Sequence, residues 1–282
     1  MKKILFTGIL LVVKVFAFTQ PAIRLYNKGV QQAEKGNYET AKRFFTKALE
    51  QDHVFSSAYY NRGLSKSNLK EYESAIADYT KAIELRPHFA IAYNNRGTDR
   101  NELKDYSGAL ADYTKAIEQD TSYAMAYYNR GIVHFKLEQY DSAIADFTKA
   151  VEKNTSYATA YNNRGTVYFK LEQYDRAIAD FTKAVDQDTA YAVAYYNCGN
   201  VYFKLEQYDM AIANFTKAIE QNTNYAKAYY NRGVVYSNLE QYDNAISDFT
   251  RAFSIDPGYK EAKIHKTILE ERKEEITARA FL

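Results

Sequence analysis

The chain has no tryptophan, one cysteine and only three prolines among its 282 residues. A single cysteine excludes an internal disulfide framework and a metal site built from several cysteines. The net charge is only +2, so the basic excess typical of nucleic-acid-binding proteins is missing and no nucleic acid is expected as a partner. The sequence also lacks HExxH, G-x-S-x-G, P-loop and G-x-G-x-x-G patterns. We therefore expect a protein that is not an enzyme and uses neither metal nor cofactor.

The first residues differ in character from the rest of the chain. Two lysines precede the apolar run ILFTGILLVV, and small residues follow near a possible cleavage point. This pattern predicts a signal peptide over residues 1–19, cut after Ala17 or after Thr19, and therefore an exported protein in the periplasm or outside the cell. The alternative is an uncleaved apolar segment on a cytoplasmic protein. The run is too short to span a bilayer and Lys14 interrupts it, so no integral membrane span is expected.

The remainder of the chain repeats with a period of 34 residues. Glycine returns at 29, 63, 97, 131, 165, 199 and 233, and alanine and aromatic positions keep the same step. Seven repeats follow, and positions are numbered from 1 to 34 within each. They span residues 22–55, 56–89, 90–123, 124–157, 158–191, 192–225 and 226–259. Positions 3, 4, 7, 8, 11 and 14, and again 17, 20, 21, 24, 27 and 28, recur at helical spacing and hold mostly small, aromatic or apolar residues. This spacing predicts two amphipathic helices per repeat.

The repeated residues resemble those of the tetratricopeptide repeat (TPR) family. The likeness rests on tyrosine at position 4, glycine at 8, alanine at 20, an aromatic residue at 24 and alanine at 27. The resemblance implies an all-α, right-handed α-solenoid of seven helix-turn-helix repeats, in which stacked hairpins cover each other's apolar faces. Residues 260–282 are predicted to form a capping helix, with Ile264, Ile268 and Ile276 facing the stack.

Position 6 is asparagine in every repeat, on the stripe of the first helix that faces the inside of the solenoid. Its members are Asn27, Asn61, Asn95, Asn129, Asn163, Asn197 and Asn231. Because an amide side chain can both donate and accept hydrogen bonds, such a row can bind the backbone of an extended peptide. It resembles the asparagine ladders of some superhelical TPR proteins. Two alternatives stay open: each asparagine bonds only to the neighbouring repeat, or the residue persists from duplication alone.

Other residues of the inner stripe flank this asparagine row. Position 5 carries tyrosine in most repeats, among them Tyr128 and Tyr196. Repeats four to six add an aromatic strip at position 12 (Phe135, Phe169, Phe203) beside a basic strip at position 13 (Lys136, Lys170, Lys204). Together they suit an extended segment with apolar or acidic side chains. The alternative is that the phenylalanines pack against the next repeat and the lysines form a solvated flank.

These features favour a protein-interaction scaffold that binds an extended peptide or protein segment in its concave groove. Two alternatives use the outer face and the ends of the solenoid instead. One is a structural or assembly subunit, and the other is a targeting module for a separate enzyme.

Cys198 occupies position 7, where five other repeats carry arginine. Those five repeats have aspartate at position 23, across the hairpin, whereas this repeat has Asn214. The joint absence predicts a partly buried Arg–Asp pair inside the other hairpins. A pair can be replaced as a whole at little cost, but removal of one partner leaves a buried charge. Cys198 is therefore interpreted as half of a paired replacement and not as a nucleophile.

Overall fold

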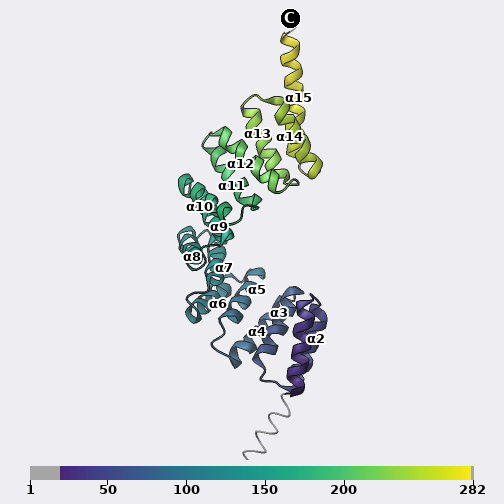
Figure 1. The fold of residues 1–282 in the computed structure, drawn as a ribbon, viewed down its shortest axis with the longest axis vertical. Helices are drawn as coiled ribbons and strands as arrows, with labels where there is room; N and C mark the ends of the chain where they lie inside the picture. Colours follow the sequence, from purple (N-terminus) through teal and green to yellow (C-terminus); the bar gives the residue numbers. More distant parts are fainter. Residues whose placement is uncertain (1–19, 281–282) are drawn as a thin grey trace, which may run out of the picture. The chain divides into compact units, whose positions relative to one another are not determined.

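The computed structural model describes residues 20–280, with side chains as far as Ile276. The predicted signal peptide, residues 1–19, lies outside the described residues. Within 20–280 every regular element is a helix, and none of these helices is long and apolar enough to cross a membrane (Figure 1). A helix over residues 20–34 comes first. It is followed by α2 (Tyr38–Gln51), α3 (Ser56–Asn68), α4 (Tyr72–Leu85), α5 (Ala90–Glu102), α6 (Tyr106–Gln119), α7 (Ala124–Lys136), α8 (Tyr140–Lys153), α9 (Ala158–Lys170), α10 (Tyr174–Gln187), α11 (Ala192–Lys204), α12 (Tyr208–Gln221), α13 (Ala226–Asn238), α14 (Tyr242–Ile255) and α15 (Lys260–Ala280).

The helices form two compact units, one ending at Lys153 and the other beginning at Asn154. In each unit a first helix packs on the second helix of its own hairpin, as α3 does on α4, and the second helix packs on the next first helix, as α4 does on α5. The all-α solenoid of helix-turn-helix repeats is thereby confirmed. Its core includes the alanines at positions 3, 20 and 27, the aromatic residue at 24 and, in repeats four to seven, valine at 10.

The turn between the two helices of a hairpin reverses the chain in very few residues. After α7 the N–H of Glu138 bonds to the carbonyl of Phe135 and that of Gln139 to the carbonyl of His134, which is the Schellman pattern of helix termination. The residue at position 15 has positive φ in each such turn, 58° at Glu138 and 77° at Gly36. Glutamate or lysine occupies this left-handed position in six turns, although glycine is the usual residue there.

Glycine at position 8 allows the two helices of a hairpin to approach closely. A Cβ added at Gly63 would lie 2.9 Å from the ring of Tyr79 and 3.2 Å from the carbonyl oxygen of Ala75. The same approach recurs at Gly131 and Phe147, with 2.9 Å to the ring. The two distances to the aromatic rings are shorter than a normal carbon–carbon contact, so a side chain at position 8 would push the two helices apart.

The predicted Arg–Asp pair is present in five hairpins. In the pair of Arg96 and Asp112, Nη2 lies 2.7 Å from Oδ1 and Nε lies 2.9 Å from Oδ2. Arg96 Nη1 also donates to Thr80 Oγ1 of the preceding repeat at 3.0 Å. The other pairs are Arg62–Asp78, Arg130–Asp146, Arg164–Asp180 and Arg232–Asp248. All five aspartates are buried. The planar fork satisfies both carboxylate oxygens, so each pair joins the two helices of its hairpin.

In two hairpins of the first unit, a basic residue at position 11 forms a second ion pair with the aspartate of the Arg–Asp pair. The repeats of the second unit have tyrosine at position 11. Lys66 Nζ lies 2.8 Å from Asp78 Oδ2 and Arg100 Nη1 lies 2.9 Å from Asp112 Oδ2. Lys66 and Arg100 therefore have a buried acidic partner at this otherwise core-facing position.

Repeat six has no such pair. Cys198 is 6% exposed and packs with Phe181 and Val201. Burial raises the pKa of its thiol to about 12, so the group stays protonated at neutral pH and is a poor nucleophile. Asn214 turns away and donates to the carbonyl of Met210 in its own helix at 2.8 Å. Cys198 is thus a small packing residue, as the paired-replacement hypothesis predicts.

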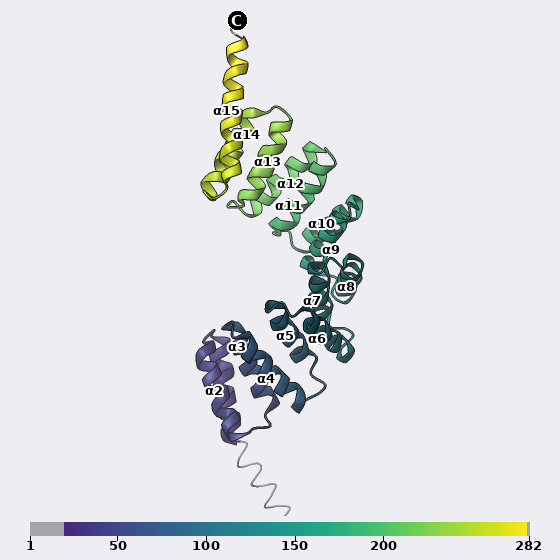
Figure 2. The ribbon, with the colours of Figure 1, turned by 180° about the vertical axis from the view of Figure 1, so that it is seen from behind.

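The helix at residues 260–280 forms and packs on α14 (Figures 1 and 2). The face that it buries differs from the predicted one. Ile264, Ile268 and Ile276 were expected to face the stack and are instead 55%, 52% and 49% exposed. The buried residues are Ala262 and Leu269, at 0% and 5%. Ala262 and Leu269 continue the 34-residue register as positions 3 and 10, so α15 docks as another first helix would.

The charge pairing can be tested in repeat six with a double-mutant cycle. We expect Cys198→Arg alone to lower the free energy of unfolding by about 3–5 kcal/mol, because it buries a cation without a partner. Adding Asn214→Asp should recover most of this loss. Urea unfolding of the wild type, both single variants and the double variant measures the coupling. Effects that add to within about 0.5 kcal/mol would refute a direct interaction.

Candidate functional site

The first helices of successive repeats lie next to each other in both units. α3 contacts α5, α5 contacts α7, α9 contacts α11 and α11 contacts α13. No comparable contact joins successive second helices within the described residues. Each unit therefore curves toward its first helices, and their shared face is the inner face on which the asparagine row was predicted.

In the first unit the asparagines bond from one repeat to the preceding one. Asn61 Nδ2 donates to the hydroxyl of Tyr26 at 2.7 Å, and Asn95 Nδ2 donates to the hydroxyl of Tyr60 at 3.0 Å. Asn129 Nδ2 donates to Asn94 Oδ1 at 3.0 Å. In each bond position 6 reaches position 5 of the repeat before. Because Asn94 in turn donates to Asn95 at 3.2 Å, the amides form a short hydrogen-bonded chain along the inner face.

The second unit repeats this arrangement. Asn197 Nδ2 donates to Asn162 Oδ1 at 2.9 Å, and Asn162 donates to Asn163 Oδ1 at 3.2 Å. Asn231 Nδ2 lies 3.1 Å from the hydroxyl of Tyr196 and 2.7 Å from Asn200 Oδ1.

The inter-repeat bonds favour the first alternative, in which the asparagines hold neighbouring repeats together. They leave the ladder hypothesis open, because an amide has two donors and an acceptor with two lone pairs. The asparagines at position 6 from Asn61 to Asn231 are all half-buried, so none of these residues is fully enclosed by its neighbours.

The predicted aromatic flank has a packing role. Tyr196 lies with its ring centroid 5.8 Å from Phe215 and 5.0 Å from Tyr225, and Tyr128 lies 5.8 Å from Phe147. The three phenylalanines at position 12 each contact the tyrosine at position 17 across the hairpin turn. The pairs are Phe135–Tyr140, Phe169–Tyr174 and Phe203–Tyr208, at 6.0, 5.9 and 6.1 Å. All five predicted aromatic residues are half-buried, so they support the inner face and expose one edge.

The predicted basic strip is exposed. Lys136 Nζ donates to Asn101 Oδ1 of the preceding repeat at 3.0 Å and lies 5.8 Å from the ring of Tyr106. Lys170 and Lys204 are exposed in the second unit. Their ammonium groups can meet an acidic partner there.

Sequence reasoning missed an apolar set at position 2. Ile23, Ile91, Met125 and Val193 are 46%, 43%, 49% and 41% exposed. Position 2 lies one turn before the asparagines, on the same side of the first helix. Position 2 is apolar in four of the seven repeats, so a comparison of the repeats at this position would have identified the set.

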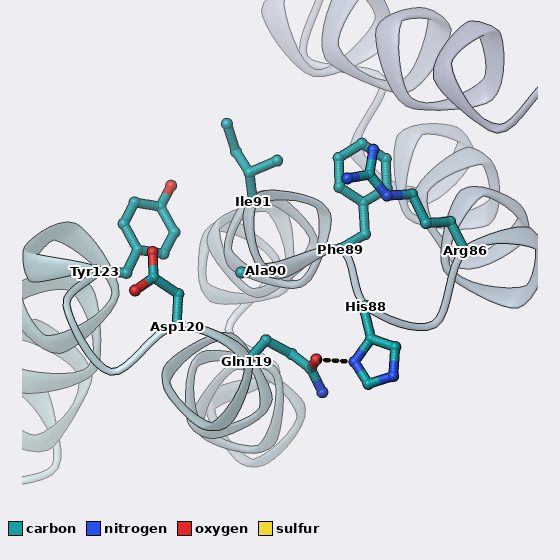
Figure 3. A pocket seen from close by; sticks show the side chains of 8 residues that line it. All are labelled: Arg86, His88, Phe89, Ala90, Ile91, Gln119, Asp120 and Tyr123. Atoms are coloured by element: carbon teal, nitrogen blue, oxygen red, sulfur yellow. Dashed lines mark hydrogen bonds between the residues drawn. The ribbon is translucent and has the colours of Figure 1, made fainter.

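A hollow of about 430 Å³ adjoins Ile91 at the start of α5 (Figure 3). The rings of Phe89 and Tyr123 line it, and the guanidinium of Arg86 lies 4.4 Å from the centroid of Phe89. Asp120 adds a carboxylate. The hollow therefore has apolar walls with charges of both signs at its rim. Such a hollow can hold a side chain of a bound peptide.

A buried acidic group lies between α3, α4 and α5. Asp99 occupies position 10, where four later repeats carry valine, and is 1% exposed. Ser67 Oγ donates to its Oδ1 at 2.6 Å. Its Oδ2 and the hydroxyl of Tyr79 are buried without a hydrogen-bond partner among the described residues. Desolvation raises the pKa of Asp99 to about 6, against the lowering effect of Ser67 and together with the charge of Glu102.

Nothing among the described residues indicates catalysis or metal binding. No group of three histidine, cysteine, aspartate or glutamate side chains there could hold a metal ion.

Family models described as TPR repeat and tetratricopeptide repeat match most of the chain. The matched residues are 24–52, 56–89, 100–138, 124–157, 165–206, 199–240 and 226–259. No curated protein matches.

Solved structures give the same result. YrrB, described as a TPR protein with an unusual peptide-binding site, is 32% identical with a TM-score of 0.56; the match covers 67% of this chain and 97% of YrrB. MamA is 27% identical with a TM-score of 0.55, over 61% of this chain and 94% of that one. A TPR protein from Parabacteroides merdae shares the fold, at 21% identity and a TM-score of 0.65, over 89% and 99% of the two chains.

The buried carboxylate predicts how stability depends on pH. Because folding raises the pKa of Asp99, the native state binds its proton more readily than the unfolded chain does. The contribution of Asp99 to the free energy of unfolding is therefore most favourable below its unfolded pKa, near 3.8. This contribution is lost as the pH rises through the folded pKa of about 6. We expect Asp99→Asn to raise the free energy of unfolding at pH 7 by on the order of 2 kcal/mol.

Urea unfolding of the wild type and the Asp99→Asn variant between pH 4 and pH 8 measures this difference. Glu73→Gln, which removes an exposed carboxylate on α4 that does not contribute to the pKa of Asp99, is the control. A difference between wild type and Asp99→Asn that stays constant across this range would contradict the assignment.

Proposed function

This chain belongs to the tetratricopeptide repeat family, and from that premise we propose that it is a protein-interaction scaffold. Its inner face binds an extended peptide or protein segment. The observation that carries this proposal is the row of half-buried amides on successive first helices, with exposed apolar side chains one turn away. The likeness to YrrB, whose description names a peptide-binding site, supports it.

The amides provide a contact that does not depend on the sequence of the ligand. Asn61, Asn95, Asn129 and Asn197 each hold the preceding repeat through one Nδ2 bond, which leaves a second N–H and lone pairs of the amide oxygen for a ligand. An extended peptide has a C=O and an N–H on each residue to meet them. Hydrogen bonds between successive repeats fix the spacing of the row, which reduces the ordering cost of binding.

Selectivity comes from the residues around the row. In the first unit Ile91 and the hollow beside it can take an apolar side chain (Figure 3). In the second unit Lys170 and Lys204 favour acidic residues. We therefore expect ligands that combine apolar and acidic side chains.

An assembly subunit is the second candidate, favoured by a specific observation. Ile264 and Ile268 are exposed on α15 and line a hollow with Phe253 and Pro257. They continue the 34-residue register as positions 5 and 9, and no further described helix covers them, so α15 offers an apolar surface on which a neighbouring protein can dock. A role as targeting module for a separate enzyme finds no comparable support.

A phage library of random 12-residue peptides, panned on the immobilised full chain, tests the proposal. We expect enrichment of peptides with apolar and acidic residues. Fluorescence anisotropy of enriched peptides should show at least a tenfold weaker affinity for Asn163→Ala, Asn197→Ala and Asn231→Ala combined, a loss of about 1.4 kcal/mol or more.

Two further variants complete this experiment. Asn154→Ala, Asn222→Ala and Asn244→Ala together remove three exposed amides outside the row, and this matched control should bind like the wild type. Lys170→Glu combined with Lys204→Glu tests the inner face and leaves the inter-repeat hydrogen bonds intact. This double variant should have a lower affinity for acidic peptides than the wild type. Absence of enrichment, or equal affinity in all folded variants, would overturn the proposal.

Export is proposed from residues 1–19 alone. If the segment is a signal peptide, the mature protein should begin after Ala17 or Thr19. N-terminal sequencing of the protein recovered from its native host checks this, and an intact Met1 would remove the proposal.

A further inference from the structure

α15 and the end of α14 form an apolar groove that the rest of the described chain does not cover. The packed face of α15 is defined by Leu269, which joins the core of Ala245 and Phe249, and by His265, which stacks on Tyr230 at 5.5 Å. Ile264 and Ile268 lie beside this packed face and are 55% and 52% exposed. With Phe253 and Pro257 they line a hollow of about 640 Å³.

Charge is distributed unevenly along this groove. Lys260 and Lys263 lie at the start of α15, before the isoleucines, and Glu271 and Glu275 lie after them. Lys263 Nζ lies 5.8 Å from the centroid of the Phe253 ring and so borders the apolar part. All four charged side chains are exposed. The face with the isoleucines therefore has a basic end, an apolar middle and an acidic end. Arg272 and Lys273, which follow Glu271 in the sequence, interact instead with Tyr242 and Asp243 of α14.

We infer that this groove binds a second copy of the chain, with the two α15 helices antiparallel about a two-fold axis. A two-fold contact requires a patch that is complementary to itself. If Ile264 of one copy lies opposite Ile268 of the other, Lys260 is four residues beyond the first and Glu271 three residues beyond the second. The two charges then face each other within about one residue, or roughly 1.5 Å along the axis.

A parallel arrangement does not have this property. It would place each lysine opposite the same lysine and each glutamate opposite the same glutamate, which repels. In the antiparallel arrangement both ends are attractive and the apolar middle is buried, with Ile264 and Ile268 of each copy inserted beside Phe253 of the other. The contact is small, so the dimer dissociates on dilution and is weaker than an obligate dimer.

A charge exchange tests the geometry. Sedimentation velocity of the full chain, over roughly a hundredfold range of concentration, should show a concentration-dependent monomer–dimer equilibrium. Lys260→Glu and Glu271→Lys should each weaken the dimer at least tenfold. An equimolar mixture of the two variants should restore it, because the mixed dimer pairs opposite charges at both ends. The chain carrying both changes should dimerise like the wild type.

An apolar variant provides an independent measurement. Ile264→Glu with Ile268→Glu should abolish dimerisation and leave the far-UV circular dichroism spectrum unchanged, because both side chains are exposed. Val54→Glu, at another exposed apolar residue, is the matched control and should dimerise normally. A wild type that is monomeric throughout, or single charge variants that dimerise as well as the wild type, would overturn the inference. Neither result bears on peptide binding in the inner face.

Discussion

Each hairpin of this protein is stable only because the next one covers its apolar face. A hairpin buries too little surface alone, so the contact between repeats supplies the stability. The alanine at position 3 fits against the alanine and aliphatic residue at positions 27 and 28 of the preceding repeat, as Ala92 does against Ala82 and Ile83. Valine at position 10 fills the space beside the preceding aromatic ring, as Val133 does at Tyr113. These contacts fix the register that every other interaction follows.

Polar interactions add to these apolar contacts between repeats. The Arg–Asp pairs connect the two helices of a hairpin, and the same arginines bond to a threonine of the preceding repeat, which connects neighbouring hairpins. The asparagines do the same on the inner face. A binding surface built from such groups is rigid before the ligand arrives, since the amides that would contact a peptide already hold the repeats in place.

Much of this could be predicted from periodicity. The 34-residue recurrence predicted the two helices of each repeat, and the joint absence of arginine and aspartate in repeat six predicted the pairs elsewhere. Both predictions rest on comparison between repeats of one chain, which supplies its own internal control. The face of α15 was mispredicted for the opposite reason: its isoleucines were interpreted from local hydrophobicity. The register would have identified Ala262 and Leu269, because residues 34 positions earlier, Ala228 and Val235, are buried. The position of Asp99 in the core, and the hollow beside Ile91, depend on how particular side chains fill space, which no repeat pattern encodes.

The Arg–Asp pair also constrains how such a chain can change over time. Its two members lie 16 residues apart within one repeat. A single substitution at either member passes through a state with a buried unpaired charge, at a cost of about 3–5 kcal/mol. Duplication or exchange of a whole 34-residue unit carries both members together and avoids that barrier. Copying of repeats can therefore spread the charged or the neutral version through the array, whereas point mutation converts one into the other only with difficulty. Cys198 and Asn214 are therefore expected to be replaced or retained together, although they lie on different helices.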